Sequence, residues 1–145
     1  MIFDNIIVAH EVIHSMLTKK KGKSGFLATK LDMSKAYDRI EWPYLEGVLT
    51  RMGFSAKWTV LIMECVKSIS YSVVLNGKHS GFFTPSRGLR QGDPISPFLF
   101  LLCAEGLSCL IRNASNEGTF QRVAAARYEP YVSHLFFVDD SLFFL

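Results

Sequence analysis

The sequence predicts an α+β domain in which one sheet carries helices packed on a face. Short apolar runs typical of strands are separated by pairs of segments with helical periodicity, and this order is typical of a sheet covered by helices. Hydrophobic residues make up 49% and charged residues 20% of the chain, which is a globular composition. The length of 145 residues suits one domain and is too short for two ordinary ones.

The N-terminal part is predicted to form a helix, a loop and a strand. Residues 5–20 have helical periodicity, and Asp4 is placed to cap the helix N-terminus. The apolar residues of the expected inner face are Ile6, Ala9, Ile13, Met16 and Leu17. A basic loop with glycines follows at residues 19–25, and its lysines are expected to be solvated or to contact nucleic acid. The stretch "FLATKL" then predicts a strand that ends at Asp32.

Two further helices and a hairpin are predicted next. Pro43 is expected to open a helix that Gly53 closes, because proline favours the first turn and glycine the position after the last. Ser55 can cap the following helix. The apolar residues of that helix recur at helical spacing: Trp58, Ile62, Cys65, Val66 and Ile69. Asn76 and Gly77 lie between two apolar runs and predict a two-residue hairpin turn, because both turn positions need positive φ.

A long apolar helix is predicted in the second half of the chain. Ser96 and Pro97 mark its start, serine as cap and proline in the first turn. Its expected core residues are Phe98, Phe100, Leu101 and Leu102. Residues 95–111 are apolar, but Glu105 and Gly106 interrupt them, whereas a membrane span needs ~20 apolar residues. We therefore expect no membrane segment.

Paired carboxylates lie in the last apolar run. Residues 131–145 predict a strand, a tight turn and a strand, with Asp139 and Asp140 near the turn. Three arrangements stay open: a hydrated turn, pairing with arginine, or binding of a divalent cation that favours both charges. Asp32 repeats the pattern at the end of another apolar strand. Oxygen ligands at two strand ends suit Mg²⁺, and two ions ~3.5–4 Å apart can activate a hydroxyl and stabilise a leaving oxygen.

The loop "SRGLRQGD" combines glycines, arginines and an amide. Arg87 and Arg90 offer charge to phosphate, and Gln91 offers hydrogen-bond donors and an acceptor. The formal net charge of +3 is only weak support for a polyanionic partner. Any contact of these arginines with nucleic acid is expected to be electrostatic and independent of base sequence.

The three cysteines, Cys65, Cys103 and Cys109, lie in apolar helical segments. An odd number without a framework spacing argues against a disulfide-rich secreted protein. No signal peptide is visible, because Asp4 and Asn5 interrupt the N-terminus. The sequence therefore predicts core cysteines in an intracellular protein, with nucleus and cytoplasm left open.

The pentapeptide HEVIH, from His10 to His14, has the H-E-x-x-H pattern of zinc proteases on a predicted helix. Such a zinc site needs a third protein ligand. Residues 15–23 contain neither histidine nor glutamate, so we expect no zinc.

Four stretches together carry a family resemblance: "DNIIVAHEVIHSM", "KLDMSKAYDRIEW", "GLRQGDPISPFLF" and "FVDDSLFF". In this order and spacing, the chain resembles the reverse transcriptase domain of non-LTR (LINE-type) retrotransposons over essentially its whole length. The resemblance implies a polymerase palm-like (ferredoxin-like) antiparallel sheet with partial fingers and no thumb. Residues 1–145 would then be a partial reverse transcriptase domain, truncated at both ends.

The resemblance also assigns roles in metal binding. Asp32 and Asp139 would hold the metal ions, the main-chain carbonyl of Met33 would be a further ligand, and Asp140 would be the partner in the hairpin turn. Two Mg²⁺ ions are the implied cofactors, with Mn²⁺ as a possible replacement.

The resemblance assigns nucleotide contacts to other residues. Tyr37 would be the aromatic steric gate, stacking under the incoming sugar and rejecting a 2′-hydroxyl. The backbone N–H groups of Lys35 and Ala36 would face the triphosphate. Gln91 and Gly92 would line the nucleotide and template pocket.

The implied activity is RNA-directed DNA polymerisation, in which a dNTP is joined to the 3′-hydroxyl of a DNA primer on an RNA template. One alternative is an inactive retrotransposon remnant or a nucleic-acid-binding fragment without catalysis. Another is an RNA-dependent RNA polymerase, which shares the paired aspartates, although Tyr37 as a sugar gate argues against it. We expect the isolated chain not to extend a primer.

Overall fold

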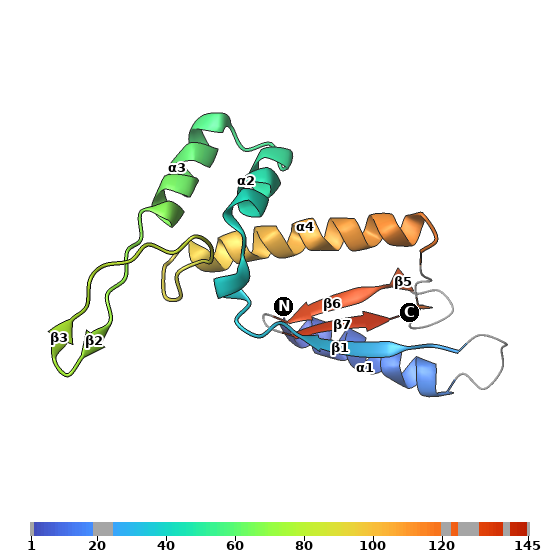
Figure 1. Ribbon diagram of the computed structural model, residues 1–145. Helices are drawn as coiled ribbons and strands as arrows, with labels where there is room; N and C mark the ends of the chain where they lie inside the picture. The colour runs from blue at the N-terminus through green and yellow to red at the C-terminus, as the bar shows by residue number, and fades with distance from the viewer. Residues whose placement is uncertain (1, 19–24, 120–122, 125–130, 138–139, 145) are drawn as a thin grey trace. The chain divides into compact units, whose positions relative to one another are not determined.

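The computed structural model describes residues 2–18, 25–119, 123–124, 131–137 and 140–144 (Figure 1). The chain forms two compact units, which are treated separately. The first, called the sheet unit, consists of residues 1–34 and 107–145. The second, called the helix unit, consists of residues 35–106.

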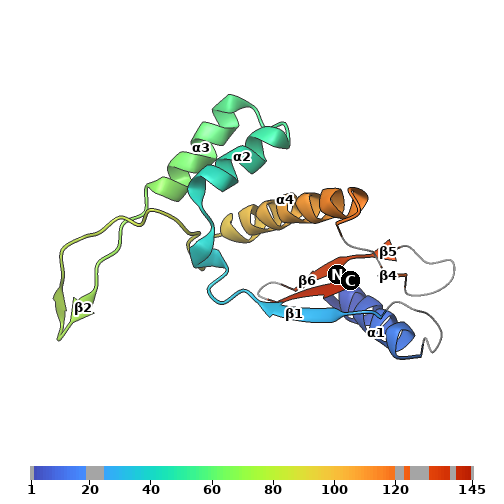
Figure 2. The same cartoon turned by 45° about the vertical axis from the view of Figure 1, so that its right-hand side comes forward.

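The sheet unit is built on a three-stranded antiparallel sheet. Its strands are β1 (Ala28–Asp32), β7 (Asp140–Phe144) and β6 (His134–Phe137), in the order β1-β7-β6. The predicted strand ending at Asp32 and the two paired C-terminal strands are thus confirmed, and β7 is the central strand. The predicted turn falls at residues 138–139, outside the described residues. A short antiparallel ladder of β4 (Val123–Ala124) and β5 (Tyr131–Val132) lies where β6 begins (Figure 2).

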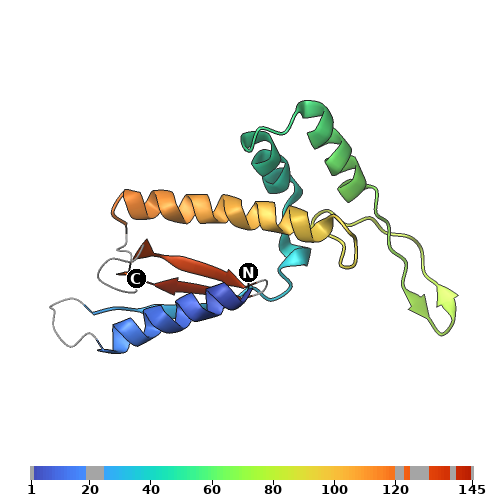
Figure 3. The same ribbon diagram turned by 180° about the vertical axis from the view of Figure 1, so that it is seen from behind.

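Helix α1 (Ile2–Thr18) packs along the sheet, as seen from behind in Figure 3. The fully buried centre of this unit is formed by Val12, Val123 and Phe144. The partly buried side chains around it are Val8, Met16, Val132, Leu135 and Leu142. The helix was predicted, but it begins at Ile2, so Asp4 lies within its first turn and is not the N-cap. Its predicted apolar face is correct for Ala9 and Met16 only, which are buried or packed against the core. Val12 is its most buried residue, whereas the expected core residues Ile6, Ile13 and Leu17 are exposed. The helix has apolar residues on several sides, so periodicity alone could not identify the side that packs against the sheet.

The helix unit begins with a 3-10 helix, η1 (Tyr37–Arg39), followed by α2 (Trp42–Arg51) and α3 (Ala56–Lys67). Ser55 caps α3 as predicted, since its side-chain oxygen accepts a hydrogen bond from the backbone N–H of Trp58 at 3.4 Å. Helices α2 and α3 contact each other. Their buried residues are Leu45, Val48, Leu49, Thr59, Met63 and Val66.

The predicted hairpin is also confirmed. Strands β2 (Val74–Leu75) and β3 (Lys78–His79) pair across the turn, where Asn76 has φ 49° and Gly77 has φ 75°. Both turn residues therefore have the positive φ that such a turn requires.

Helix α4 (Ser96–Asn116) starts where the sequence predicts and contributes residues to both units. Within the described residues it is the one helix long and apolar enough to cross a membrane, with a mean hydropathy of 1.3. The expectation that this segment falls short of such a span was therefore wrong by length and composition. Only 22% of this apolar stretch is buried. Its buried residues include Cys103, and the Ser108 hydroxyl lies 2.8 Å from His134 Nε2 in the sheet unit.

A close approach of α2 and α4 explains one glycine. The hydroxyl of Tyr44 donates a hydrogen bond to the carbonyl of Cys103 at 2.9 Å. A Cβ at Gly106 would lie 2.8 Å from the Tyr44 hydroxyl oxygen and 3.0 Å from a Val48 methyl carbon. Gly106 therefore lets the two helices approach closely, a role that no local sequence signal predicts.

Several expected core residues are on the surface. The exposed fractions of Phe98 and Leu101 are 68% and 63%, and that of Trp58 is 59%. Of the three cysteines only Cys103 is buried, whereas Cys65 and Cys109 are exposed, so the prediction of three core cysteines was wrong. Burial raises the pKa of the Cys103 thiol to about 11.

Candidate active site

The carboxylates of Asp32 and Asp140 lie at the same end of the sheet. These two residues are direct partners in the antiparallel ladder between β1 and β7. Direct partners have Cβ atoms about 4.5–5.5 Å apart, with both side chains on one face of the sheet. Two like charges in this position repel each other, so the arrangement calls for a compensating cation.

The compensating cation in the structure is Lys30. Its Nζ lies 2.7 Å from Oδ2 of Asp140. Lys30 is two residues before Asp32, so strand alternation places both on the same face. The hydrogen bond to Asp140 and the charge of Asp140 raise the pKa of Lys30, with a smaller contribution from Asp32 and partial opposition from desolvation.

Lys30 was not among the predicted site residues, although Asp32 and Asp140, on the same face of the sheet, were. The signal was present in "KLD", where a lysine and an aspartate alternate on one side of a strand. The register between β1 and β7, which brings Asp140 opposite Asp32, cannot be predicted from this local pattern.

The donor set at this end of the sheet fits a divalent cation. Carboxylate oxygens are preferred ligands of Mg²⁺, which typically takes one or two carboxylates and keeps several waters. Asp32 is exposed and the Asp140 side chain is 38% exposed, so water can complete a coordination shell. Met33, the predicted carbonyl ligand, is half-buried and follows Asp32 directly. The predicted ligand Asp139 lies outside the described residues. Among the residues that are described, no three His, Cys, Asp or Glu side chains form a metal-binding group.

The predicted nucleotide contacts lie in the helix unit. Lys35 has φ 57°, an uncommon conformation for a residue with a side chain. Its carbonyl accepts a hydrogen bond from the N–H of Arg39 at 3.2 Å, and the same N–H also donates at 3.4 Å to the carbonyl of Ala36, the N-cap of η1. Ala36, which follows Lys35, is buried. Backbone strain of this kind is found at functional sites when the surrounding structure maintains it.

Tyr37 is held by contacts on two sides. Its ring stacks on Phe100 of α4, with the centroids 4.7 Å apart and the planes 5° from parallel. Its carbonyl accepts a hydrogen bond from the N–H of Leu89 at 2.9 Å. Tyr37 is half-buried. Phe100, predicted only as a core residue, is therefore also the support of the predicted sugar gate.

Gly88 connects the arginine-containing loop to the segment around Tyr37. Gly88 has φ 94°, and a Cβ added to it would lie 3.0 Å from the carbonyl oxygen of Asp38. Its N–H donates to the carbonyl of Ile40 at 2.8 Å, and its carbonyl accepts from Nε1 of Trp42 at 2.9 Å. Only glycine combines this conformation with such a close backbone approach.

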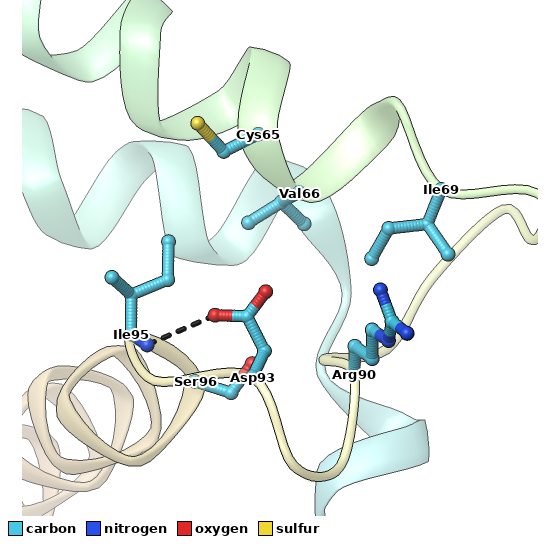
Figure 4. Close-up of a pocket in the computed structure, with 7 residues that line it drawn as sticks. All are labelled: Cys65, Val66, Ile69, Arg90, Asp93, Ile95 and Ser96. Carbon is cyan, nitrogen blue, oxygen red and sulfur yellow. Dashed lines mark hydrogen bonds between the residues drawn. The ribbon is translucent and has the colours of Figure 1, made fainter.

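Gln91 and Gly92 form the exposed tip of a turn. The N–H of Asp93 donates to the carbonyl of Arg90 at 3.4 Å, and Gly92 has φ 84°, as a turn with glycine at its third position requires. The Asp93 carboxylate accepts a hydrogen bond from the N–H of Ile95 at 2.9 Å, just before α4 begins (Figure 4).

The two arginines of this loop differ in their surroundings. Nη1 of Arg87 pairs with Oε1 of Glu41 at 3.1 Å. Among the described residues no ion pair involves Arg90, which is exposed. Arg90 lines a small open hollow (Figure 4), whose other residues are Cys65, Val66, Ile69, Asp93, Ile95 and Ser96. Arg90 is therefore the better placed of the two for contact with a phosphate.

A family model described as "Reverse transcriptase (RNA-dependent DNA polymerase)" matches residues 3–145. The chain belongs to the reverse transcriptase family. The family match leaves the H-E-x-x-H pattern without support as a protease motif. Its histidines, His10 and His14, are exposed on α1 with their rings stacked at 6.5 Å.

Curated relatives come from mobile elements and from a mitochondrion. The transposon TX1 uncharacterized 149 kDa protein of Xenopus laevis is 32% identical over 112 residues, 77% of this chain and 8% of that protein. A retrovirus-related Pol polyprotein from the type-1 retrotransposable element R2 of Popillia japonica is 27% identical over 138 residues, 95% of this chain and 21% of that protein. An uncharacterized mitochondrial protein of Arabidopsis thaliana is 48% identical over 68 residues, 47% of this chain and 56% of that protein. These relatives confirm the expected likeness to a LINE-type reverse transcriptase domain.

The fold matches a solved polymerase structure. An apo telomerase from Candida tropicalis, truncated from its C-terminal domain, superposes with a TM-score of 0.63 at 18% identity, covering 97% of this chain and 28% of that one. The predicted fold class, a palm-like α+β arrangement with an antiparallel sheet, is therefore confirmed.

Proposed function

We propose that this reverse transcriptase chain carries a divalent-metal site for nucleotidyl transfer from a dNTP to the 3′-hydroxyl of a DNA primer on an RNA template. The observation that carries the proposal is the direct pairing of Asp32 with Asp140 at one end of the sheet. Family membership supplies the reaction class.

In this proposal Asp32 and Asp140 hold the metal together with Asp139 and the main-chain carbonyl of Met33, the ligands that the resemblance implies. Mg²⁺, with Mn²⁺ as a substitute, would supply Lewis acidity toward the phosphoryl group and favour deprotonation of the primer hydroxyl. The protein contributes orientation, because β1 and β7 set the spacing of two carboxylates and their exposure leaves room for water and phosphate oxygens.

The helix unit would handle the nucleotide and the template strand. Tyr37 keeps a fixed ring plane because it stacks on Phe100, and a rigid ring is suited to exclude a 2′-hydroxyl. The exposed turn of Gln91 and Gly92 offers backbone and amide groups to a base or sugar. Arg90 would contact a backbone phosphate, and that contact should weaken as salt increases.

Metal binding tests the proposal directly on the purified chain. Free Mn²⁺ can be followed by electron paramagnetic resonance while protein is added. We expect binding to the wild type and at least tenfold weaker binding to Asp32→Asn. Glu64→Gln, an exposed change in α3 with the same loss of one negative charge, is the matched control and should bind like the wild type. Equal binding by all three proteins, or none by the wild type, would refute the metal site.

The alternative function, nucleic-acid binding without catalysis, has its own support in the exposed Arg90, for which the described part of the chain offers no ion-pair partner. Titrating the protein with an RNA–DNA primer–template at several salt concentrations distinguishes this alternative from the polymerase function. Salt-sensitive binding that is lost with Arg90→Gln, in a chain that binds no Mn²⁺, would favour the alternative.

A further inference from the structure

The Lys30–Asp140 ion pair lies at the residues proposed to hold metal. It joins β1 to β7 diagonally, since Lys30 is the direct ladder partner of Leu142 and Asp140 that of Asp32. All four side chains lie on one face of the sheet, because direct partners share a face and alternate residues do too. The ammonium group contacts Asp140 at 2.7 Å and also feels the charge of Asp32 on the same face.

A divalent ion at these carboxylates would compete with Lys30 in two ways. It would need Oδ2 of Asp140, the oxygen that the ammonium group contacts at 2.7 Å. It would also be repelled by the ammonium charge, which lies 2.7 Å from the Asp140 oxygen that the metal would need.

We propose that Lys30 is the internal counter-cation of the Asp32–Asp140 pair, and that a divalent metal ion binds there only when the ammonium group releases Asp140. Lys30 thus lowers the affinity of the site for metal and keeps the carboxylate pair compensated when metal is absent. The proposal rests on the proposed function, since it assumes that the metal binds at these two carboxylates.

The solvent exposure of Lys30 and Asp140 limits how strongly the ammonium group can weaken metal binding. The side chains of Lys30 and Asp140 are 61% and 38% exposed, so water and salt screen their attraction. Removing the ammonium charge should strengthen metal binding roughly three- to tenfold at low salt, from the repulsion between a dication and a monocation at ~5 Å in a medium close to water. The difference should shrink at high salt.

Three variants of the full chain test this with Mn²⁺ as the probe. Lys30→Met removes the charge and keeps an unbranched side chain of similar length. Lys30→Arg keeps the charge. Lys67→Met is the matched control, because Lys67 is a similarly exposed lysine, paired with Glu46 at 3.8 Å in the helix unit, and its loss changes the net charge equally. Circular dichroism should show the same helix content for all variants.

The expected result is a three- to tenfold lower Mn²⁺ dissociation constant for Lys30→Met, with Lys30→Arg and Lys67→Met within twofold of the wild type. The gain should disappear when Asp140→Asn is added to Lys30→Met. Unchanged or weaker binding by Lys30→Met would overturn the inference, because Lys30 would then be neutral or would orient Asp140 for the metal. An equal gain from Lys67→Met would also overturn it, by showing an effect of net charge alone. In these cases the wild type still binds Mn²⁺ and the proposed function stands. Absence of binding in both the wild type and Lys30→Met would reject both.

Discussion

Gly88 is the position where one added carbon should disturb the helix unit most. Gly88→Ala places a Cβ at φ 94°, a conformation that costs an L-residue about 1–2 kcal/mol. The same Cβ would lie 3.0 Å from the carbonyl oxygen and 3.1 Å from the Cα of Asp38. Both atoms are backbone atoms, so relief requires moving the loop away from η1, which costs a further ~1–3 kcal/mol. The expected loss in the free energy of unfolding is therefore about 2–4 kcal/mol.

Substitutions of two other glycines separate the cost of the backbone conformation from the cost of the close contact. Gly53 has φ 86° with no atom within 4 Å of an added Cβ, so Gly53→Ala measures the backbone cost alone, about 1–2 kcal/mol. Gly47 lies inside α2 with open space around it, so Gly47→Ala should stabilise the protein by about 0.5–1 kcal/mol.

Urea unfolding followed by tryptophan fluorescence is the appropriate assay, because Nε1 of Trp42 donates to the carbonyl of Gly88. Its emission reports on the contact that the substitution disturbs. If Gly88→Ala loses no more stability than Gly53→Ala, the close contact with Asp38 carries no energy and the reasoning fails.

Three further predictions concern thiols, the aromatic stack and activity. At neutral pH, Cys65 and Cys109 should react readily with a thiol reagent and Cys103 only on unfolding, as mass spectrometry can check. Burial raises the pKa of Cys103 from 9.0 to about 11, so its contribution to stability is fully present below pH 9 and is lost as the pH rises to about 11; Cys103→Ala should flatten that part of the pH–stability profile. Phe100→Leu should cost about 1–2 kcal/mol and free the ring of Tyr37, whereas Tyr37→Phe should keep the stack, as double-mutant unfolding would show. The isolated chain should give no primer extension with Mg²⁺, and extension that stops with Asp32→Asn would contradict this.

Local signals in the sequence predicted the elements well because each rests on short-range chemistry. The Asn76–Gly77 turn, the Ser55 cap and the start of α4 at Ser96 all depend on neighbouring residues, and all were confirmed. The side of a helix that packs depends instead on its neighbours in space. That is why Val12 is buried while the expected core residue Leu17 is exposed.

The residues of the candidate site also divide into those that a local motif predicts and those that only tertiary packing reveals. Motif resemblance named Asp32, Asp140 and Tyr37, but it could not name the residues that hold them. Phe100 supports Tyr37 through a contact across 63 residues of sequence, and Lys30 meets Asp140 only through strand pairing. Such partners follow from tertiary packing and carry no short-range signal.

Register is the property on which the metal site depends. A shift of one residue between β1 and β7 would move one carboxylate of the pair to the other face of the sheet and end the contact with Lys30. The observed register also pairs Ala28 with Phe144, and Phe144 is fully buried against α1 in the core of the sheet unit. A slip would take this aromatic ring out of the core, at a cost of about 3–5 kcal/mol if the loss resembles removal of the side chain. Burial at one end of the ladder therefore maintains the pairing of carboxylates at the other, and Phe144→Ala should weaken Mn²⁺ binding without touching a metal ligand.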